Sequence, residues 1–137
     1  MSSTAGIMGG LGPHAYTAAK HAIVGITKSV ASELAGHDIR VNCISPAGMA
    51  TPMVASIMAQ TDLEDTKHML VEGSPLKGRP GLAEDVVNAL LFLASGESGY
   101  TSGLNLTMDA GITIGSGNPS MFQEYQPFVG EAGKRGL

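Results

Sequence analysis

Apolar residues recur every three or four positions along residues 13–34, and this spacing predicts an amphipathic helix. The apolar stripe consists of Ala15, Ala18, Ala22, Ile23, Ile26, Val30 and Leu34. Pro13 suits the first helical turn, where the missing N–H has no helical partner, and Gly36 suits the carboxyl-terminal cap. We therefore expect one long helix that begins at Pro13 and ends near residue 35.

Two later segments alternate apolar and polar residues in the way that strands do. Residues 39–45 alternate and are closed by Pro46, and residues 103–109 alternate and lead into a glycine. Residues 1–5 are too short for a full strand and are predicted to be a strand stub. Asn42 belongs to the first of these strands, either as a functional residue or as a side chain satisfied by neighbouring backbone.

The segments around these strands differ in regularity. Residues 82–94 predict a second apolar helix, and residues 51–72 predict one or two short helices. A loop dense in glycine and proline follows over residues 73–81. Residues 112–137 show no period, and we expect either an extension folded over another surface or a disordered tail.

Composition and charge narrow the range of partners. A chain of 137 residues with 43% hydrophobic residues is expected to form one domain, and its formal net charge of −4 comes with scattered basic residues. This balance argues against nucleic acid and anionic membranes as partners. The longest apolar run, residues 89–94, is far shorter than the ~18 residues of a membrane-spanning helix. Without a charged signal peptide at the start, we expect a cytoplasmic protein.

The single cysteine and the four histidines indicate no metal or disulfide chemistry. Cys43 is the only cysteine, so it cannot form an internal disulfide, which suits a reducing compartment. It is expected to be a small buried residue of the first strand. The histidines have no spacing typical of metal ligands, and we expect no metal site.

Tyr16 and Lys20 stand four residues apart on the predicted long helix. Residues at this spacing share one helix face, so the Lys20 ammonium is expected beside the Tyr16 phenol. A fixed positive charge favours the phenolate form, which suits proton transfer to or from an alcohol or carbonyl oxygen. Taken alone, this motif is more often a solvated helix face than a catalytic site.

A glycine-rich segment precedes this helix. Residues 6–12 fit the pattern Gly-x-x-x-Gly-x-Gly, which is also found in phosphate-binding loops. Such a loop follows an apolar strand, and the next strand ends in an acidic residue. Residues 1–5 supply no full strand, and Pro46 follows the next strand without an acid. We therefore interpret residues 6–12 as a crossover into the helix.

Several spaced motifs together resemble the short-chain dehydrogenase/reductase family. The similar segments are residues 3–6, 12–22, 39–46, 50–53 and 102–111. Within the family, residues 9–16 and 20–25 are most similar to the plant group that contains secoisolariciresinol, xanthoxin and tasselseed-type dehydrogenases. The resemblance implies a partial family domain over residues 1–111.

The resemblance assigns roles to six residues. It implies that Ser3 hydrogen-bonds the substrate oxygen, that Tyr16 is the acid/base, and that Lys20 stabilises the phenolate and binds the nicotinamide ribose of NAD or NADP. Three further residues match the segment that holds the nicotinamide carboxamide: Pro46, Met49 and Thr51.

Two features of the matching segments need separate mention. Ala110 stands where a glycine is usual, and Ala47 and Gly48 fill the usual Pro-Gly-x positions in shifted order. Residues 52–81 correspond to the lid over the substrate in the family. The methionines of this region either line an apolar pocket or serve ordinary packing: Met49, Met53, Met58 and Met69.

The family's dinucleotide-binding βαβ unit has no counterpart in this chain. Fifteen residues precede Tyr16, whereas a βαβ unit needs about thirty. The expected fold is therefore α/β, the C-terminal half of a Rossmann-like doubly wound parallel sheet. Such a half would leave helix faces and one strand edge open, so we expect the isolated polypeptide to be unstable or to associate through residues 13–34 and the last strand.

Two functions follow from the resemblance. The first is an NAD(P)-dependent oxidoreductase that acts on a secondary alcohol or ketone of a small apolar metabolite and assembles as a dimer or tetramer. The second is a truncated, catalytically weak chain that serves only as an oligomerisation partner of full-length relatives.

Overall fold

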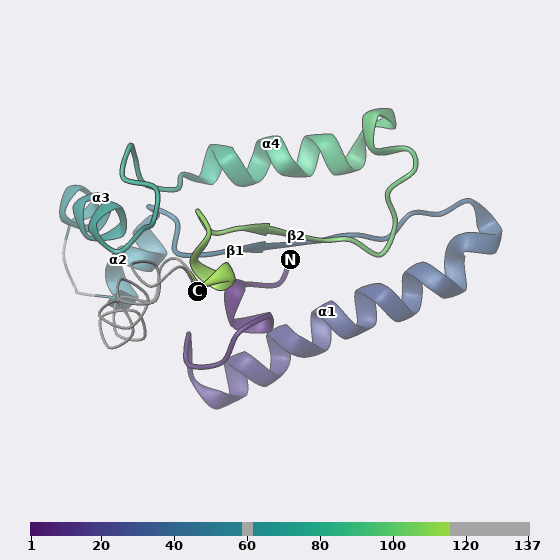
Figure 1. Cartoon of the computed structure of the whole chain (residues 1–137), viewed down its shortest axis with the longest axis horizontal. Coiled ribbons are helices and arrows are strands. Elements are labelled where there is room, and N and C mark those ends of the chain that lie inside the picture. Colours follow the sequence, from purple (N-terminus) through teal and green to yellow (C-terminus); the bar gives the residue numbers. More distant parts are fainter. Residues whose placement is uncertain (59–61, 116–137) are drawn as a thin grey trace, which may run out of the picture.

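The computed structural model describes residues 1–58 and 62–115, and these form a layered α/β unit (Figure 1). Two parallel strands, β1 (Cys43–Pro46) and β2 (Asn105–Met108), pair with Cys43 opposite Asn105. Helix α1 (His14–Leu34) covers one face of the strands and helix α4 (Ala83–Ala94) covers the other. The expected α/β fold with a parallel sheet is confirmed.

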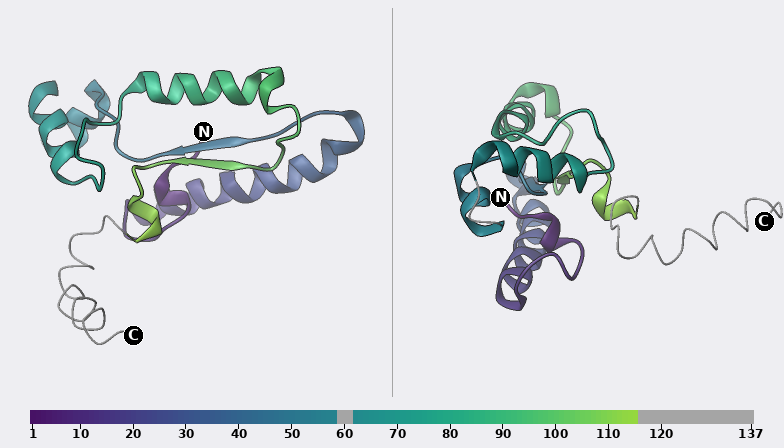
Figure 2. Two further views of the ribbon diagram at one scale, coloured as in Figure 1. Left: turned by 45° about the horizontal axis from the view of Figure 1, so that its top comes forward. Right: turned by 90° about the vertical axis from the view of Figure 1, so that its left-hand side faces the viewer.

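The lid region forms two short helices at one end of the sheet. Helix α2 (Pro52–Met58) and helix α3 (Leu63–Glu72) lie beyond the carboxyl ends of the strands (Figure 2). Short 3₁₀ turns complete the fold: η1 (Thr4–Gly6), η2 (Ala35–His37), η3 (Gly96–Ser98) and η4 (Ile112–Ile114). The rest of the expected C-terminal extension, residues 116–137, lies outside the described residues.

The long helix ends differently from the sequence prediction. Helix α1 passes into η2, and the residue that closes η2 in the left-handed conformation is Asp38, with a φ of 58°. The Asp38 N–H donates to the Ala35 carbonyl at 3.2 Å. Aspartate is one of the few residues other than glycine that tolerate this region of backbone space. The cap of α1 itself is Ala35, one position before the predicted Gly36.

Strand β1 is shorter than predicted, and before Cys43 one backbone bond, from the Gly103 N–H to the Val41 carbonyl at 2.7 Å, is joined by bonds that involve side chains. The Val41 N–H donates to the Ser102 hydroxyl at 3.1 Å. The Asn42 amide donates to the Thr101 carbonyl at 2.8 Å and accepts from the Leu104 N–H at 3.0 Å. Of the two interpretations of Asn42, the one in which neighbouring backbone satisfies it is confirmed.

The buried apolar core of the described part of the chain is small. Its members lie where α1, α4 and the lid meet β1 and η1: Ala5, Ala31, Cys43, Ile44, Ala55 and Leu93. Large apolar side chains on α4 are exposed instead, with Val87 at 51%, Leu90 at 56% and Leu91 at 62%.

Among the described residues, no helix is long and apolar enough to cross a membrane.

One half-buried arginine, Arg40, ties the far end of the sheet together. The Arg40 guanidinium donates to the Ser98 hydroxyl at 2.8 Å, to the Ser95 carbonyl at 3.1 Å and to the Thr101 carbonyl at 3.3 Å. Ser98 in turn donates to the Leu93 carbonyl at 2.9 Å. This network fixes the connection between α4 and β2 against the start of β1.

Candidate active site

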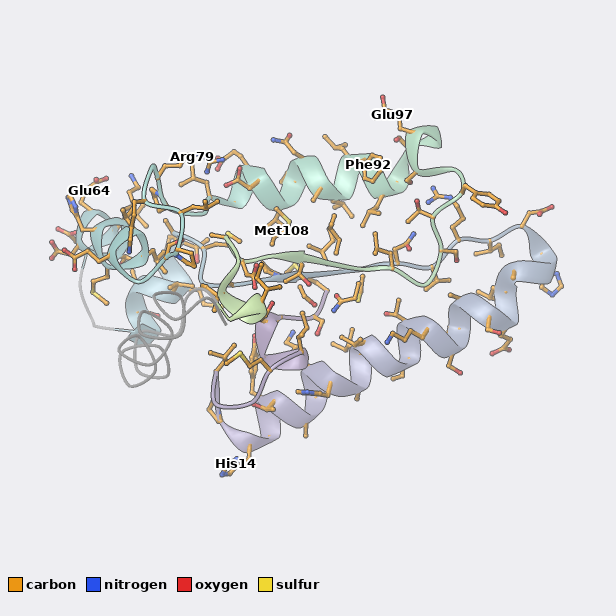
Figure 3. All side chains as sticks on the ribbon, viewed as in Figure 1. His14, Glu64, Arg79, Phe92, Glu97 and Met108 are labelled. Atoms are coloured by element: carbon orange, nitrogen blue, oxygen red, sulfur yellow. The ribbon has the colours of Figure 1, made fainter. Side chains whose placement is uncertain are left out.

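The carboxyl ends of both strands meet the first turn of α1 and the lid at one edge of the molecule. Figure 3 shows His14, in the first turn of α1, at this end, with its side chain directed away from the sheet. Ligands of open α/β sheets bind at the carboxyl edge of the strands. The sequence-predicted site residues belong to elements that begin or end here.

Tyr16 and Lys20 lie together on α1, as their spacing predicts. The Lys20 ammonium nitrogen is 5.3 Å from the centroid of the Tyr16 ring, within the range of a cation–π contact. It also donates to the Met1 carbonyl at 3.4 Å. Tyr16 is 44% exposed, so its phenol is open to a ligand. The structure confirms the pairing of the two side chains, whereas the catalytic role of the pair stays a prediction.

Ser3 is the N-cap of η1, which packs against the N-terminal half of α1 (Figure 1). The Ser3 hydroxyl oxygen accepts from the Ala5 N–H at 3.2 Å and caps this turn. A hydroxyl has one donor and two acceptor positions, so this bond leaves the O–H free to donate elsewhere. Ser3 is half-buried, and its hydroxyl can therefore serve a substrate oxygen as well as the turn.

The glycine-rich residues 6–12 connect η1 to α1 and do not follow a strand. Residues 1–3 form no strand, and η1 itself includes Gly6. A phosphate-binding loop requires a strand immediately before it. The predicted strand stub over residues 1–5 was therefore wrong, because residues 4–6 form η1, and the segment runs from this turn into α1.

Pro46, Met49 and Thr51 lie on one segment that runs from the end of β1 into α2. This segment is fastened on both sides, because the Ala47 N–H donates to the Met108 carbonyl at 2.9 Å and the Ala50 N–H donates to the Gly81 carbonyl at 2.8 Å. The Thr51 hydroxyl accepts from the Val54 N–H at 3.3 Å and keeps its own O–H. The segment is therefore held in place before any ligand binds.

An apolar cavity of about 240 Å³ lies between this segment, the lid and the end of β2. Its apolar walls come from Ala47, Met49, Met69, Leu70, Met108 and Ile112. Of the lid methionines considered from the sequence, Met49 and Met69 line the cavity, Met53 is 66% exposed and outside its lining, and the side chain of Met58 lies outside the described residues. No sequence pattern predicted the place of Ile112 in this lining, since it lies beyond the last strand.

Asp109 lies at the wall of this cavity but serves the turn that follows β2. Its carboxylate accepts from the Gly111 N–H at 2.9 Å, the Thr113 N–H at 2.7 Å and the Thr113 hydroxyl at 2.6 Å. Burial raises the pKa of Asp109, but these hydrogen bonds outweigh it and hold the pKa below its ordinary value. The cavity therefore has an acidic residue whose charge is already satisfied by the protein.

The fold is thus a parallel α/β sheet with a tyrosine–lysine pair on helix α1. A family model described as enoyl-(acyl carrier protein) reductase matches residues 1–113. The chain belongs to the short-chain dehydrogenase/reductase family.

Among curated relatives, the chain is similar to two plant dehydrogenases. It is 48% identical over 118 residues to (+)-borneol dehydrogenase 2 of Salvia officinalis, covering 82% of this chain and 42% of that protein. It is 44% identical over 118 residues to xanthoxin dehydrogenase of Arabidopsis thaliana, covering 82% of this chain and 41% of that protein. The chain thus spans less than half the length of these relatives.

Solved structures show the same arrangement. Levodione reductase superposes with a TM-score of 0.72 at 32% identity, over 83% of this chain and 45% of that chain. A 4-hydroxyisoleucine dehydrogenase complexed with NADH superposes with a TM-score of 0.67 at 33% identity, again over 83% of this chain and 45% of that chain. The structural neighbours therefore include an enzyme of the family with a bound nicotinamide cofactor.

Proposed function

We propose that this chain supplies the proton-transfer residues of an NAD(P)-dependent oxidoreductase that interconverts a secondary alcohol and a ketone. The observation that carries the proposal is the contact of the Lys20 ammonium with the exposed Tyr16 ring, 5.3 Å from its centroid, at the carboxyl edge of the sheet. The Ser3 hydroxyl on the adjacent η1 completes a set of donors for one substrate oxygen.

Each of the three residues has a distinct task in this proposal. Tyr16 exchanges the proton with the substrate oxygen through its phenol. Ser3 donates a hydrogen bond to the same oxygen, and so stabilises the negative charge that develops there. Lys20 stabilises negative charge on the phenol oxygen through its nearby ammonium.

The residues around Ser3, Tyr16 and Lys20 fit the nicotinamide end of NAD or NADP. This cofactor, when bound, carries the hydride. The Lys20 ammonium has three donors, and one of them reaches the Met1 carbonyl over a long 3.4 Å. Its remaining donors can bind ribose hydroxyls. Pro46, Met49 and Thr51 are proposed to hold the carboxamide, since their segment is already fixed at the end of β1.

The cavity beside Met49 supports a small apolar substrate. Its volume of about 240 Å³ is slightly below the range of roughly 300–1,000 Å³ that is usual for ligand pockets. Thioether side chains such as Met49 and Met69 adapt to irregular hydrocarbon shapes. We propose that the cavity receives the hydrocarbon part of the substrate.

The test replaces Tyr16 by phenylalanine and measures alcohol oxidation with NAD⁺ and NADP⁺, using (+)-borneol and cyclohexanol as probes. Tyr100 is fully exposed and gives a matched control, Tyr100→Phe. Loss of the general acid/base is expected to lower turnover by about 100-fold or more. The control is expected to keep the wild-type rate. Turnover of Tyr16→Phe within twofold of wild type would contradict the proposal.

A second candidate function rests on the coverage of 41–42% of the curated relatives. In this alternative the chain is catalytically weak and acts as an oligomerisation partner of full-length relatives, since binding energy from the rest of the cofactor is needed to position the reacting atoms. Titration with NADH separates the two. Fluorescence enhancement at micromolar NADH favours the oxidoreductase, and its absence at millimolar NADH favours the oligomerisation partner.

A further inference from the structure

Ser2, the residue before Ser3, is held between the sheet and α1. It is 3% exposed. Its backbone N–H donates to the Ile44 carbonyl of β1 at 2.8 Å. Its hydroxyl donates to the Lys20 carbonyl of α1 at 2.8 Å. A single residue therefore links the strand, the helix that carries Tyr16 and Lys20, and the turn that carries Ser3.

The contact at the Lys20 carbonyl is a close approach between backbones. Gly6 of η1 lies against the same peptide group, and a Cβ added at Gly6 would lie 2.5 Å from the Lys20 carbonyl oxygen and 2.8 Å from its carbon. The same Cβ would also collide with the Ser2 hydroxyl. Only glycine fits here, so η1 and α1 meet without a side chain between them, and the Ser2 hydroxyl supplies the polar contact.

Lys20 is therefore hydrogen-bonded to residues 1–2 through both its backbone carbonyl and its side-chain ammonium. Its carbonyl accepts from Ser2, and its ammonium donates to the Met1 carbonyl at 3.4 Å. Ser3 follows in extended conformation, with φ −164° and ψ 164°. The position of the Ser3 hydroxyl relative to α1 thus depends on where Ser2 holds the helix.

We propose that Ser2 is a positioning residue of the proton-transfer site: its hydroxyl sets the place of α1 against η1, and so the separation of the Ser3 hydroxyl from the Tyr16 phenol. The proposal rests on the proposed function for its effect on turnover. A displacement of about 1 Å between reacting groups lowers a rate by up to roughly 100-fold. Ser2 itself touches no substrate and exchanges no proton.

The test compares Ser2→Ala with a matched control on the same helix. Thr27 is 7% exposed and donates its hydroxyl to the Ile23 carbonyl at 2.8 Å, so Thr27→Val also removes a buried hydroxyl–carbonyl bond. Both variants are expected to lower the thermal midpoint. Only Ser2→Ala is expected to lower kcat, by about 10- to 100-fold, with KM for the alcohol within about twofold. Equal kcat values for the two variants would overturn the proposal.

A second measurement works without turnover and so separates this proposal from the proposed function. The three tyrosines are labelled as 3-fluorotyrosine, and the ¹⁹F resonance of Tyr16 is assigned with Tyr16→Phe. Because the Lys20 ammonium lies over the Tyr16 ring, displacement of Lys20 is expected to move this resonance in Ser2→Ala and not in Thr27→Val. If the wild-type protein is inactive but the resonance still moves in Ser2→Ala, the proposed oxidoreductase function is refuted and the positioning role of Ser2 is supported. An unmoved resonance would refute the positioning residue.

A conservative replacement, Ser2→Cys, tests the proposal if Ser2→Ala does not fold. Ser2→Cys keeps the size of the side chain and replaces the hydroxyl by a weak donor. If Ser2→Ala does not fold, Ser2→Cys is expected to give a kcat between wild type and one-tenth of it, with the same movement of the Tyr16 resonance. Wild-type kcat together with an unmoved resonance in Ser2→Cys would then overturn the proposal.

Discussion

Ala110 occupies a backbone conformation that favours glycine, and replacing it should stabilise the protein. In the turn after β2 its φ is 54°, in the left-handed region, and Gly111 follows with a φ of 91°. For a residue with a Cβ this conformation costs roughly 1–2 kcal/mol. Glycine loses more backbone freedom on folding, which offsets about 0.5–1 kcal/mol. The balance predicts that Ala110→Gly raises the free energy of unfolding by about 0.5–1 kcal/mol.

Thermal unfolding followed by circular dichroism measures this effect. For a chain of this size the gain corresponds to a rise in Tm of roughly 1–5 °C. All variants are compared at one protein concentration, because association shifts Tm. Ala22→Gly is the control, since Ala22 is exposed within α1 and the same replacement there is expected to cost about 1 kcal/mol. If Ala110→Gly lowered Tm as the control does, the argument from backbone strain would be wrong.

Two further predictions concern polar contacts around α4. Hydrogen bonds from Arg79 and from the Leu82 N–H lower the pKa of Asp85 to about 2. Because this folded-state pKa lies below the unfolded value of about 3.9, the stabilisation is complete above the unfolded value and is lost as the pH falls towards 2. Asp85→Asn should therefore lower the urea midpoint at pH 7 and match wild type near pH 2; equal midpoints at pH 7 would contradict this. Arg40→Met should lower the free energy of unfolding by about 2–3 kcal/mol, because it removes charged hydrogen bonds to Ser98 and two carbonyls. An unchanged urea midpoint would show that the Arg40 network contributes nothing.

The elements that the sequence predicted correctly depend on local patterns. Helix α1 and helix α4 follow from apolar spacing within each segment, and their observed bounds lie within about two residues of the predicted ones. The predicted bounds are wrong where hydrogen-bond partners far along the chain determine the local structure. Strand β1 begins at Cys43, after two hydrogen bonds that involve side chains: the Val41 N–H donates to the Ser102 hydroxyl, and the Asn42 side chain donates to the Thr101 carbonyl. Such partners, about sixty positions away, leave no signal in the alternation of residues 39–45.

The candidate site likewise has one part that local sequence spacing predicts and other parts that depend on distant residues. The Tyr16–Lys20 contact follows from helical spacing alone, so the sequence was sufficient to predict it. Ser2 contacts Lys20 and Ile44, which are 18 and 42 positions away. The local sequence around Ser2 contains no pattern that predicts these contacts. The apolar cavity likewise brings together the ends of both strands and α3. These relations exist only in three dimensions.

Cys43 gives the fold an internal reporter of local opening. It is the single cysteine of the chain, it is 5% exposed, and its thiol donates to the Asn105 side chain on β2 at 3.1 Å. Because this sulfur is buried, a thiol-reactive reagent is expected to reach it mainly when the fold opens around β1. The labelling rate of the unmodified protein therefore measures the free energy of that opening, and no engineered probe is needed.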